Sequence, residues 1–150
     1  MIKINVIVKN KFWMQRIAKP EIYFVKKVNK LNLKNKYFNK KKLEFTLLLS
    51  DEKEIKKLNK KFRNKNKATD VLSFPMSHKI ILNKKKRLYV GDVIINLDHL
   101  KKNKENSNFK ESLDKLLIHG FLHLLGKRHE TEKNYLQMKK LEDKYFKSIN

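Results

Sequence analysis

The stretch LLIHGFLHLLGKRHE, residues 116 to 130, gathers three of the chain's five histidines into eleven residues. His119 and His123 are four residues apart, so in an α-helix their imidazoles lie one above the other on the same face. Gly126 suits the position just beyond a helix end, where a residue in the left-handed conformation reverses the chain. A turn there folds His129 back beside the first two rings. The stretch therefore predicts a helix that ends near Gly126 and a cluster of three imidazoles.

The same helix should be buried. Asn108 with Glu111 has the polar spacing of a helix start. Apolar residues then recur along one face at helical spacing, at Leu113, Leu116, Leu117, Phe121 and Leu124. We expect this helix to be the central element of the fold, with the histidines at the edge of its apolar stripe.

Three imidazoles at the spacing H-x3-H-x5-H favour a metal site. Two nitrogen ligands one turn apart, and a third from the following loop, close one face of a tetrahedron and leave the fourth position open to water. That arrangement is typical of catalytic zinc, with one ion per chain, although imidazoles also bind nickel, copper and iron. The alternative is that His119 and His123 only border a core and that His129 is a surface residue. The spacing and the glycine at the turn favour the metal.

A zinc peptidase is another interpretation of the same spacing. Metzincin proteases carry H-E-x-x-H-x-x-G-x-x-H, in which the glutamate after the first histidine is the general base that activates water. Here that position is Gly120, which cannot move a proton. A peptidase is therefore the weaker prediction.

The rest of the chain alternates between strand and helix patterns. Four segments are typical of strands, at residues 2–9, 42–50, 69–75 and 87–98, and segment 42–50 is apolar enough to be more central. Residues 77–87 should form a flexible hairpin loop.

One helix starts at Pro20, with Ile22, Val25, Val28 and Leu31 on its apolar face and Lys26, Lys27 and Lys30 opposite. A second, capped by Ser50 or Asp51 with Glu54, buries Ile55, Leu58 and Phe62. Helix continues after Asp98, and the last one should pack Tyr135, Met138, Leu141 and Tyr145 in a structural role. We expect one α+β domain over residues 1–150, a four-stranded sheet packed with helices.

Composition narrows the function classes. The chain has no cysteine, which excludes disulfide-linked partners and thiolate chemistry, and it has no apolar run long enough for a signal peptide or a membrane span. A cytoplasmic protein is the expectation. The formal net charge of +23 points to a polyanion such as nucleic acid, or else to a general bias towards lysine and asparagine. Arginines are few among these cations, so each arginine is more suited than any one lysine to a role that needs a planar guanidinium.

Three motifs carry a resemblance to a known family. HGFLHLLGKRH (residues 119–129) resembles the signature H-G-x-L-H-L-x-G-Y-D-H of the YbeY family, bacterial metal-dependent endoribonucleases of ribosomal RNA maturation. LNKKFRNKNKATDVLSFP (58–75) resembles the second conserved block of that family, and VGDVIIN (90–96) resembles the third. The likeness runs from about Leu43 to Phe146. It implies that the four-stranded sheet mixes parallel and antiparallel strands.

The resemblance also implies residue roles. His119, His123 and His129 would ligate zinc, and Arg63 would be the catalytic arginine facing the metal, although by itself Arg63 is equally well a surface cation. Apart from the resemblance, the mechanism we expect would use Lys60, Lys61, Lys65 and Lys67, near Arg63, to hold flanking phosphates. Other polar residues near the motifs have structural roles as their first interpretation: Thr69, Ser73, Asp92, the loop residue His78 and the helix-start residue His99.

Two departures from the family pattern bear on the site. Lys127-Arg128 stands where the family has Tyr-Asp, and Lys115 stands where it often has a histidine. The extra cations should weaken the hold on a dication while strengthening attraction for phosphate. The orienting role of the missing aspartate is unfilled unless Glu130 takes it.

The implied function is cleavage of single-stranded RNA in the maturation of the 16S rRNA 3′ end and in ribosome quality control. The protein would act as a monomer on the small ribosomal subunit. The alternative is a non-catalytic assembly factor that binds rRNA and carries a structural metal.

Overall fold

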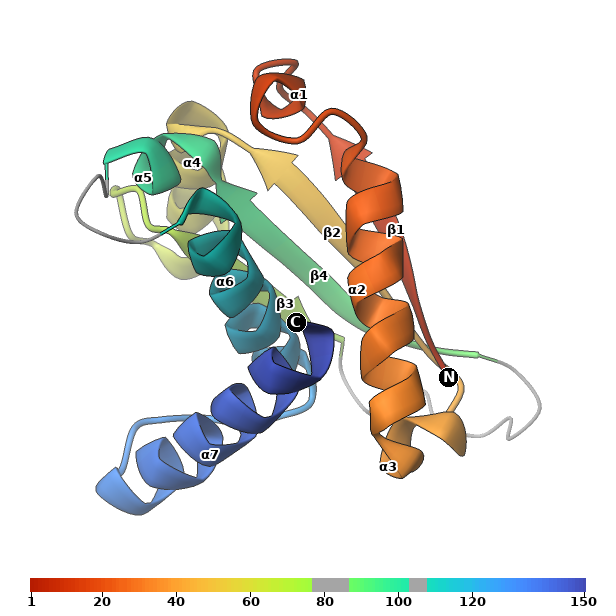
Figure 1. Cartoon of the computed structure of the whole chain (residues 1–150). Helices are drawn as coiled ribbons and strands as arrows, with labels where there is room; N and C mark the ends of the chain where they lie inside the picture. The colour runs from red at the N-terminus through yellow and green to blue at the C-terminus, as the bar shows by residue number, and fades with distance from the viewer. Residues whose placement is uncertain (77–86, 103–107) are drawn as a thin grey trace.

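The computed structural model describes residues 1–76, 87–102 and 108–150. Its sheet has four strands in the order β1-β2-β4-β3 (Figure 1). The strands are β1 Ile2–Val8, β2 Leu43–Ser50, β3 Val71–Pro75 and β4 Leu88–Asn96. β2 pairs in parallel with both β1 and β4, whereas β3 is antiparallel to β4. The mixed four-stranded sheet is confirmed, and β2, the segment predicted to be more central, lies in its interior.

Helices cover both faces of this sheet. The described helices are α1 Trp13–Arg16, α2 Pro20–Lys34, α3 Lys36–Asn39, α4 Glu52–Arg63, α5 Leu97–Lys102, α6 Phe109–Leu124 and α7 Glu132–Ile149. α2, α6 and α7 lie on one face and α4 on the other (Figure 1). Alternation along β2 serves both layers, because Leu47 points into the larger core and Leu48 packs on the smaller one under α4. The α+β architecture is confirmed.

α6 is the buried central helix that its sequence predicts. The Asn108 side chain caps it by accepting a hydrogen bond from the Lys110 N–H at 3.1 Å. Gly120 lies so close to the sheet that a Cβ atom there would be 2.6 Å from Cγ1 of Val93. The Ser73 hydroxyl, on β3, donates to the Gly120 carbonyl at 3.1 Å. The absence of a side chain at position 120 therefore lets α6 pack against β3 and β4.

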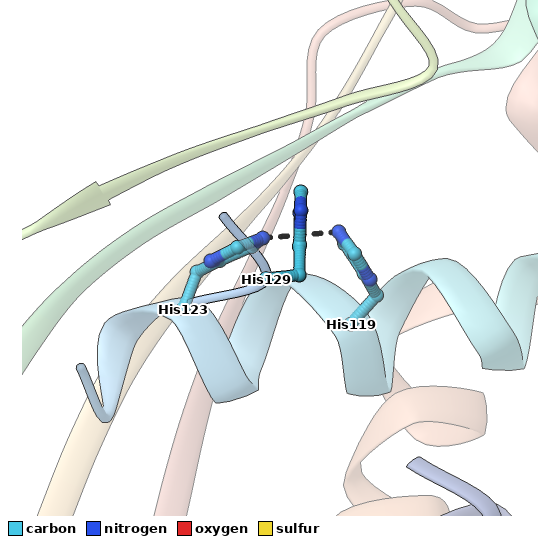
Figure 2. Close-up of side chains that lie close together, drawn as sticks. All are labelled: His119, His123 and His129. Carbon is cyan, nitrogen blue, oxygen red and sulfur yellow. Dashed lines mark hydrogen bonds between the residues drawn. The ribbon is translucent and has the colours of Figure 1, made fainter. Parts of the chain in front are cut away.

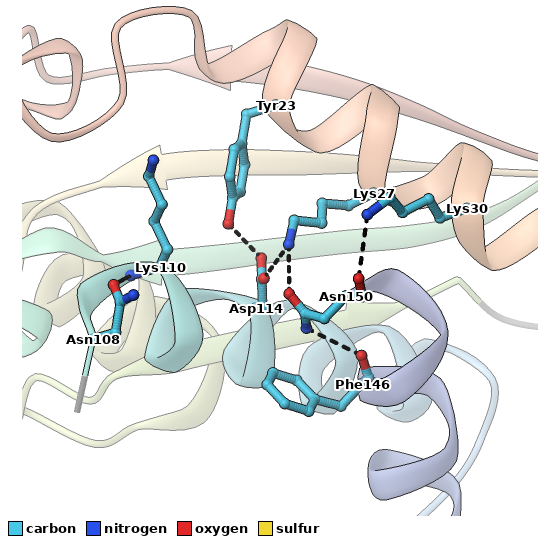
Figure 3. Close-up of polar contacts among 8 residues, drawn as sticks. All are labelled: Tyr23, Lys27, Lys30, Asn108, Lys110, Asp114, Phe146 and Asn150. Carbon is cyan, nitrogen blue, oxygen red and sulfur yellow. Dashed lines mark hydrogen bonds and ion pairs between the residues drawn. The ribbon is translucent and has the colours of Figure 1, made fainter.

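A buried carboxylate ties α6 to α2. Asp114 accepts hydrogen bonds from the Tyr23 hydroxyl at 2.8 Å and from Lys27 Nζ at 2.6 Å (Figure 3). Burial, followed by the hydrogen bond to Asp114, raises the pKa of Tyr23. Lys27 was predicted only to lie opposite the apolar face of α2, and its flexible stem lets the ammonium group reach the buried Asp114.

Three residues predicted to lie in the core are exposed: Ile22, Phe62 and Tyr135. α2 turns Phe24 inward instead, with Val28 and Leu31. Ile22 and Tyr135 lie near helix ends, where the neighbouring elements no longer cover the predicted face. The Phe62 ring packs edge-on against Phe74, with centroids 5.3 Å apart, and stays largely open to solvent.

Other local predictions have mixed outcomes. Asp51 is the cap of α4, since it accepts a hydrogen bond from the Glu54 N–H at 2.9 Å. His99 lies in the first turn of α5, as expected. The predicted hairpin loop, including His78, lies outside the described residues except at its last position. The short helices α1 and α3 were not predicted. Among the described parts of the chain, no helix has the length and apolar character needed to cross a membrane.

Candidate metal centre

The first two histidines of the motif project from the same side of α6. Figure 2 shows the His119 and His123 rings pointing toward one another, with their Nε2 atoms 3.0 Å apart. The one-turn spacing predicted this arrangement, because side chains four residues apart share a helix face. Both side chains are partly exposed at the helix edge, so a ligand from solvent can reach them.

The end of α6 delivers the third histidine. Gly126 has φ +79°, the left-handed conformation, and its N–H donates to the His123 carbonyl at 3.0 Å. The Lys127 N–H donates to the Leu122 carbonyl at 3.0 Å, which completes a Schellman turn. The reversed chain brings the His129 ring centroid to 5.0 Å from that of His123. One nitrogen from each of the three rings lies within 4.8 Å of the other two.

Acceptors on the far side of two rings fix their tautomers. His119 Nδ1 lies 2.6 Å from Oε1 of Glu142, on α7, and His123 Nδ1 lies 2.9 Å from the Lys127 carbonyl. A carboxylate and a carbonyl can only accept, so both neutral rings carry their proton on Nδ1 and present a lone pair at Nε2. Burial lowers the pKa of His123, and charge on His119 lowers it further, which favours the neutral form that a metal requires. The hydrogen bond from His119 lowers the pKa of Glu142.

This donor set fits a metal ion. Two imidazole lone pairs that face each other at 3.0 Å cannot hydrogen-bond unless one ring is protonated, so the space between them favours a cation. Nitrogens bound to one tetrahedral zinc at about 2.0–2.1 Å are roughly 3.3 Å apart, close to the separation of these two Nε2 atoms. The three histidines can therefore hold a metal ion together.

The histidine cluster lies in a cleft of about 940 Å³. Four cationic residues line this cleft beside the histidines, namely Arg63, Lys65, Lys127 and Arg128. Two carboxylates, Asp70 and Glu130, also line it. The wall is thus mainly cationic and suits a phosphate-bearing ligand.

Arg63 reaches the cleft from the last position of α4. Asn64 follows it with φ 53°, a left-handed residue that ends the helix. The Arg63 guanidinium lies over the Phe74 ring, 5.9 Å from its centroid, and its Nη2 donates to the Ser73 carbonyl at 3.2 Å. These contacts hold the guanidinium beside β3, and Arg63 lines the same cleft as the three histidines.

Of the four lysines expected to contact phosphate, only Lys65 is among the residues that line the cleft. Lys65 lines the cleft, whereas Lys67 does not belong to the lining residues. The Lys67 carbonyl accepts a hydrogen bond from the Asn59 side chain at 2.8 Å, which braces the loop after α4. Lys65 therefore remains a candidate for phosphate contact, and the placement of Lys67 does not support that role.

Sequence reasoning missed Glu142. Glu130, the residue considered for an orienting role, pairs instead with Arg128 at 3.3 Å on the exposed surface. Glu142 lies on the packed face of α7, four residues after buried Met138 and three before buried Tyr145. A carboxylate in an apolar stripe was the signal available in the sequence.

The chain is similar to proteins of a single description over most of its length. The family model described as "Endoribonuclease YbeY" matches residues 8–150, a longer stretch than the region from Leu43 to Phe146 that the motifs indicated. "Endoribonuclease YbeY" of Pelagibacter ubique is 45% identical over 151 residues, covering 99% of this chain and 97% of that protein. The protein of the same description from Sulfurihydrogenibium sp. is 38% identical, over 94% of this chain and 97% of its own length.

A solved structure shares the fold. The solution structure of TM1509 from Thermotoga maritima superposes with a TM-score of 0.61 at 26% sequence identity. The superposition covers 99% of this chain and 89% of that one.

Proposed function

The chain belongs to the YbeY endoribonuclease family, and from that premise we propose that it is a metal-dependent endoribonuclease that cleaves single-stranded RNA. One observation carries the proposal: the three histidines and Arg63, which are far apart in the sequence, line the same cationic cleft. A cluster that only bordered a core would have no need of a guanidinium beside it.

The metal we propose is zinc, one ion per chain, held by His119, His123 and His129. Imidazole ligands without a thiolate suit zinc, and three of them leave one coordination position free. When bound, the ion would supply Lewis-acid chemistry at a phosphoryl oxygen or at a water molecule.

Arg63 is the residue we propose to act on the reacting phosphate. Its planar guanidinium can donate to two phosphoryl oxygens at once and so offset the negative charge that grows on them during cleavage. The contact with the Ser73 carbonyl uses Nη2, and within the described residues no other N–H group of the fork has a hydrogen-bond partner.

Lys65, Lys127 and Arg128 would hold the neighbouring phosphates of the strand. Their charges line the same cleft as the histidines, from the loop after α4 and from the turn after α6. Contacts of this kind position the RNA and carry no sequence information. The Lys127-Arg128 pair adds phosphate attraction at the position where the family signature has Tyr-Asp.

The biological setting we propose follows from the family. We infer a role in the cytoplasm, in 16S rRNA 3′-end maturation and ribosome quality control, with the protein acting as a monomer on the small ribosomal subunit. The net charge of +23 supports a polyanionic partner of this kind.

One assay separates the candidate functions. Zinc-loaded protein is incubated with single-stranded RNA and with casein, with and without a chelator, beside the variant His123→Ala. We expect new RNA ends that require the metal and His123, and intact casein. Salt-sensitive RNA binding without cleavage would instead support an assembly factor with a structural metal, and chelator-sensitive casein cleavage would support a peptidase.

A further inference from the structure

We propose that Glu142 is a positioning residue of the metal centre, and that α7 therefore belongs to the site rather than only to the scaffold. The inference rests on the proposed binding of a metal by the three histidines. In this account the Glu142 carboxylate fixes the rotamer and tautomer of His119, so that Nε2 of that ring is aimed at the ion.

The contact itself has the geometry of a strong hydrogen bond. Oε1 of Glu142 lies 2.6 Å from His119 Nδ1, and the two side chains are 30% and 32% exposed. A bond from a ring N–H to an ionised carboxylate is shorter and stronger than a neutral one. It also fixes the orientation of the ring, so that the opposite nitrogen keeps its lone pair directed at a cation.

Glu142 is itself held in place by the packing of α7. Met138 and Tyr145, one turn to either side of it, are buried against the core, and Ile149 buries the end of the helix. The carboxylate therefore starts from a rigid helix and has little conformational freedom to lose when it bonds to His119. Such support is what a ligand needs to stay within a fraction of an ångström of its productive position.

Glu142 is also distinct from the other partners of the cluster. His123 is oriented by the backbone carbonyl of Lys127, which no substitution removes directly. Among the described residues, Glu142 is the one carboxylate that forms a hydrogen bond with any of the three histidine rings, and it does so with His119. The negative charge it places behind His119 offsets part of the positive charge of an ion in a cleft that Lys127 and Arg128 make more cationic.

A simpler role for Glu142 would be an interhelical ion pair that only holds α7 against α6. The two roles predict different losses. An ion pair for packing contributes to the stability of the metal-free protein and leaves the affinity for metal unchanged. A positioning residue affects metal affinity and ligand geometry, and does so even in a protein that is fully folded.

The test compares Glu142→Ala and Glu142→Gln with the wild type and with Glu111→Gln. The control removes a carboxylate from an exposed i,i+4 pair on α6, that of Glu111 with Lys115 at 2.7 Å. Three quantities are measured on the full chain: the zinc affinity by competition with a chromophoric chelator, the absorption spectrum of the cobalt-substituted protein, and the thermal midpoint without metal.

We expect Glu142→Ala to bind zinc about 10- to 100-fold more weakly and to change the cobalt spectrum. Glu142→Gln should fall between it and the wild type, because its amide oxygen still accepts the Nδ1 proton without the charge. Glu111→Gln should behave as wild type, and the Gln variant preserves the test if the Ala variant fails to fold.

Affinity and spectrum equal to wild type in both Glu142 variants would overturn the inference and leave the proposed function standing. A wild type that binds neither zinc nor cobalt would overturn both.

Discussion

Nδ1 of His123 lies 2.9 Å from the carbonyl oxygen of Lys127, so the turn that ends α6 also orients one of the candidate ligands. That carbonyl is in place because Gly126 adopts φ +79° and reverses the chain after Leu125. The helix end and the histidine cluster therefore form one unit. A change in the turn alters the position of two rings, those of His123 and His129.

Substitution of Gly126 should weaken both stability and metal binding. A Cβ at this position meets nothing within 4 Å, so the penalty comes from the backbone conformation alone. Gly126→Ala should lower the free energy of unfolding by roughly 1–2 kcal/mol, as expected for a left-handed alanine. Gly126→Asn should lose less, because asparagine tolerates this conformation. Urea denaturation and zinc titration of both variants check this, and equal losses for Ala and Asn would contradict it.

Arg63→Ala should separate catalysis from metal binding. The guanidinium lines the cleft and contacts none of the three histidines through a hydrogen bond among the described residues, so zinc content should remain at the wild-type level. The rate of RNA cleavage should fall about 10²- to 10³-fold, the usual loss when one donor to a developing oxyanion is removed. Single-turnover cleavage with metal analysis of the same samples gives both values.

The matched control for Arg63 is Arg16→Ala. Arg16 lies over the Phe109 ring at 5.3 Å and does not line the cleft. Its loss should leave the cleavage rate unchanged. An Arg63→Ala protein that cuts RNA as fast as this control would show that the guanidinium has no part in the reaction.

The pair Lys127→Ala with Arg128→Ala should weaken RNA binding uniformly across sequences. If each side chain contacts one phosphate of a single strand, the slope of log affinity against log salt should become shallower by about 0.7 per contact, or roughly 1.4 for the pair. Fluorescence anisotropy with single-stranded RNA at several salt concentrations measures this slope. Lys26→Ala with Lys34→Ala removes the same charge from the exposed side of α2 and should change the slope less. Equal slope changes in the two double variants would argue for general charge attraction and against contact in the cleft.

Stability should depend on acid through Asp51. The hydrogen bond from the Glu54 N–H holds the pKa of Asp51 below its ordinary value. A depressed carboxyl pKa stabilises the fold fully above the unfolded value of about 3.9, and that contribution is lost as pH falls through the folded pKa. Asp51→Ala should therefore cost about 1 kcal/mol of unfolding free energy near neutral pH. The gap to wild type should shrink near pH 3, which urea denaturation at the two pH values measures. A difference in unfolding free energy that stays the same at the two pH values would contradict a role for the Asp51 charge. Asp51→Asn should retain the cap at both pH values.

The histidine cluster could be predicted because its geometry is local. His119 and His123 share a helix face by periodicity, and Gly126 marks the turn that returns His129. The four strands and the interior position of β2 could be predicted in the same way, from the pattern of apolar residues along each segment.

Contacts between distant segments could not be predicted in this way. Glu142 meets His119 only because α7 packs back across α6, and Lys27 meets Asp114 only because α2 lies beside α6. Periodicity gives the direction of a helix face but not how far its neighbours extend, which is why Ile22 and Tyr135 are exposed. The short helices α1 and α3 bury Trp13 and Phe38, and tertiary packing rather than local pattern defines them.

Convergence of the three imidazoles on one ion is tested by the metal content of the purified protein, measured by elemental analysis for wild type and for His129→Ala. We expect one zinc per chain in the wild type and a marked loss in the variant, with the thermal midpoint of the metal-free forms nearly equal. Wild-type protein that binds no metal, or a His129→Ala protein that holds it as tightly, would contradict the convergence of three imidazoles on one ion.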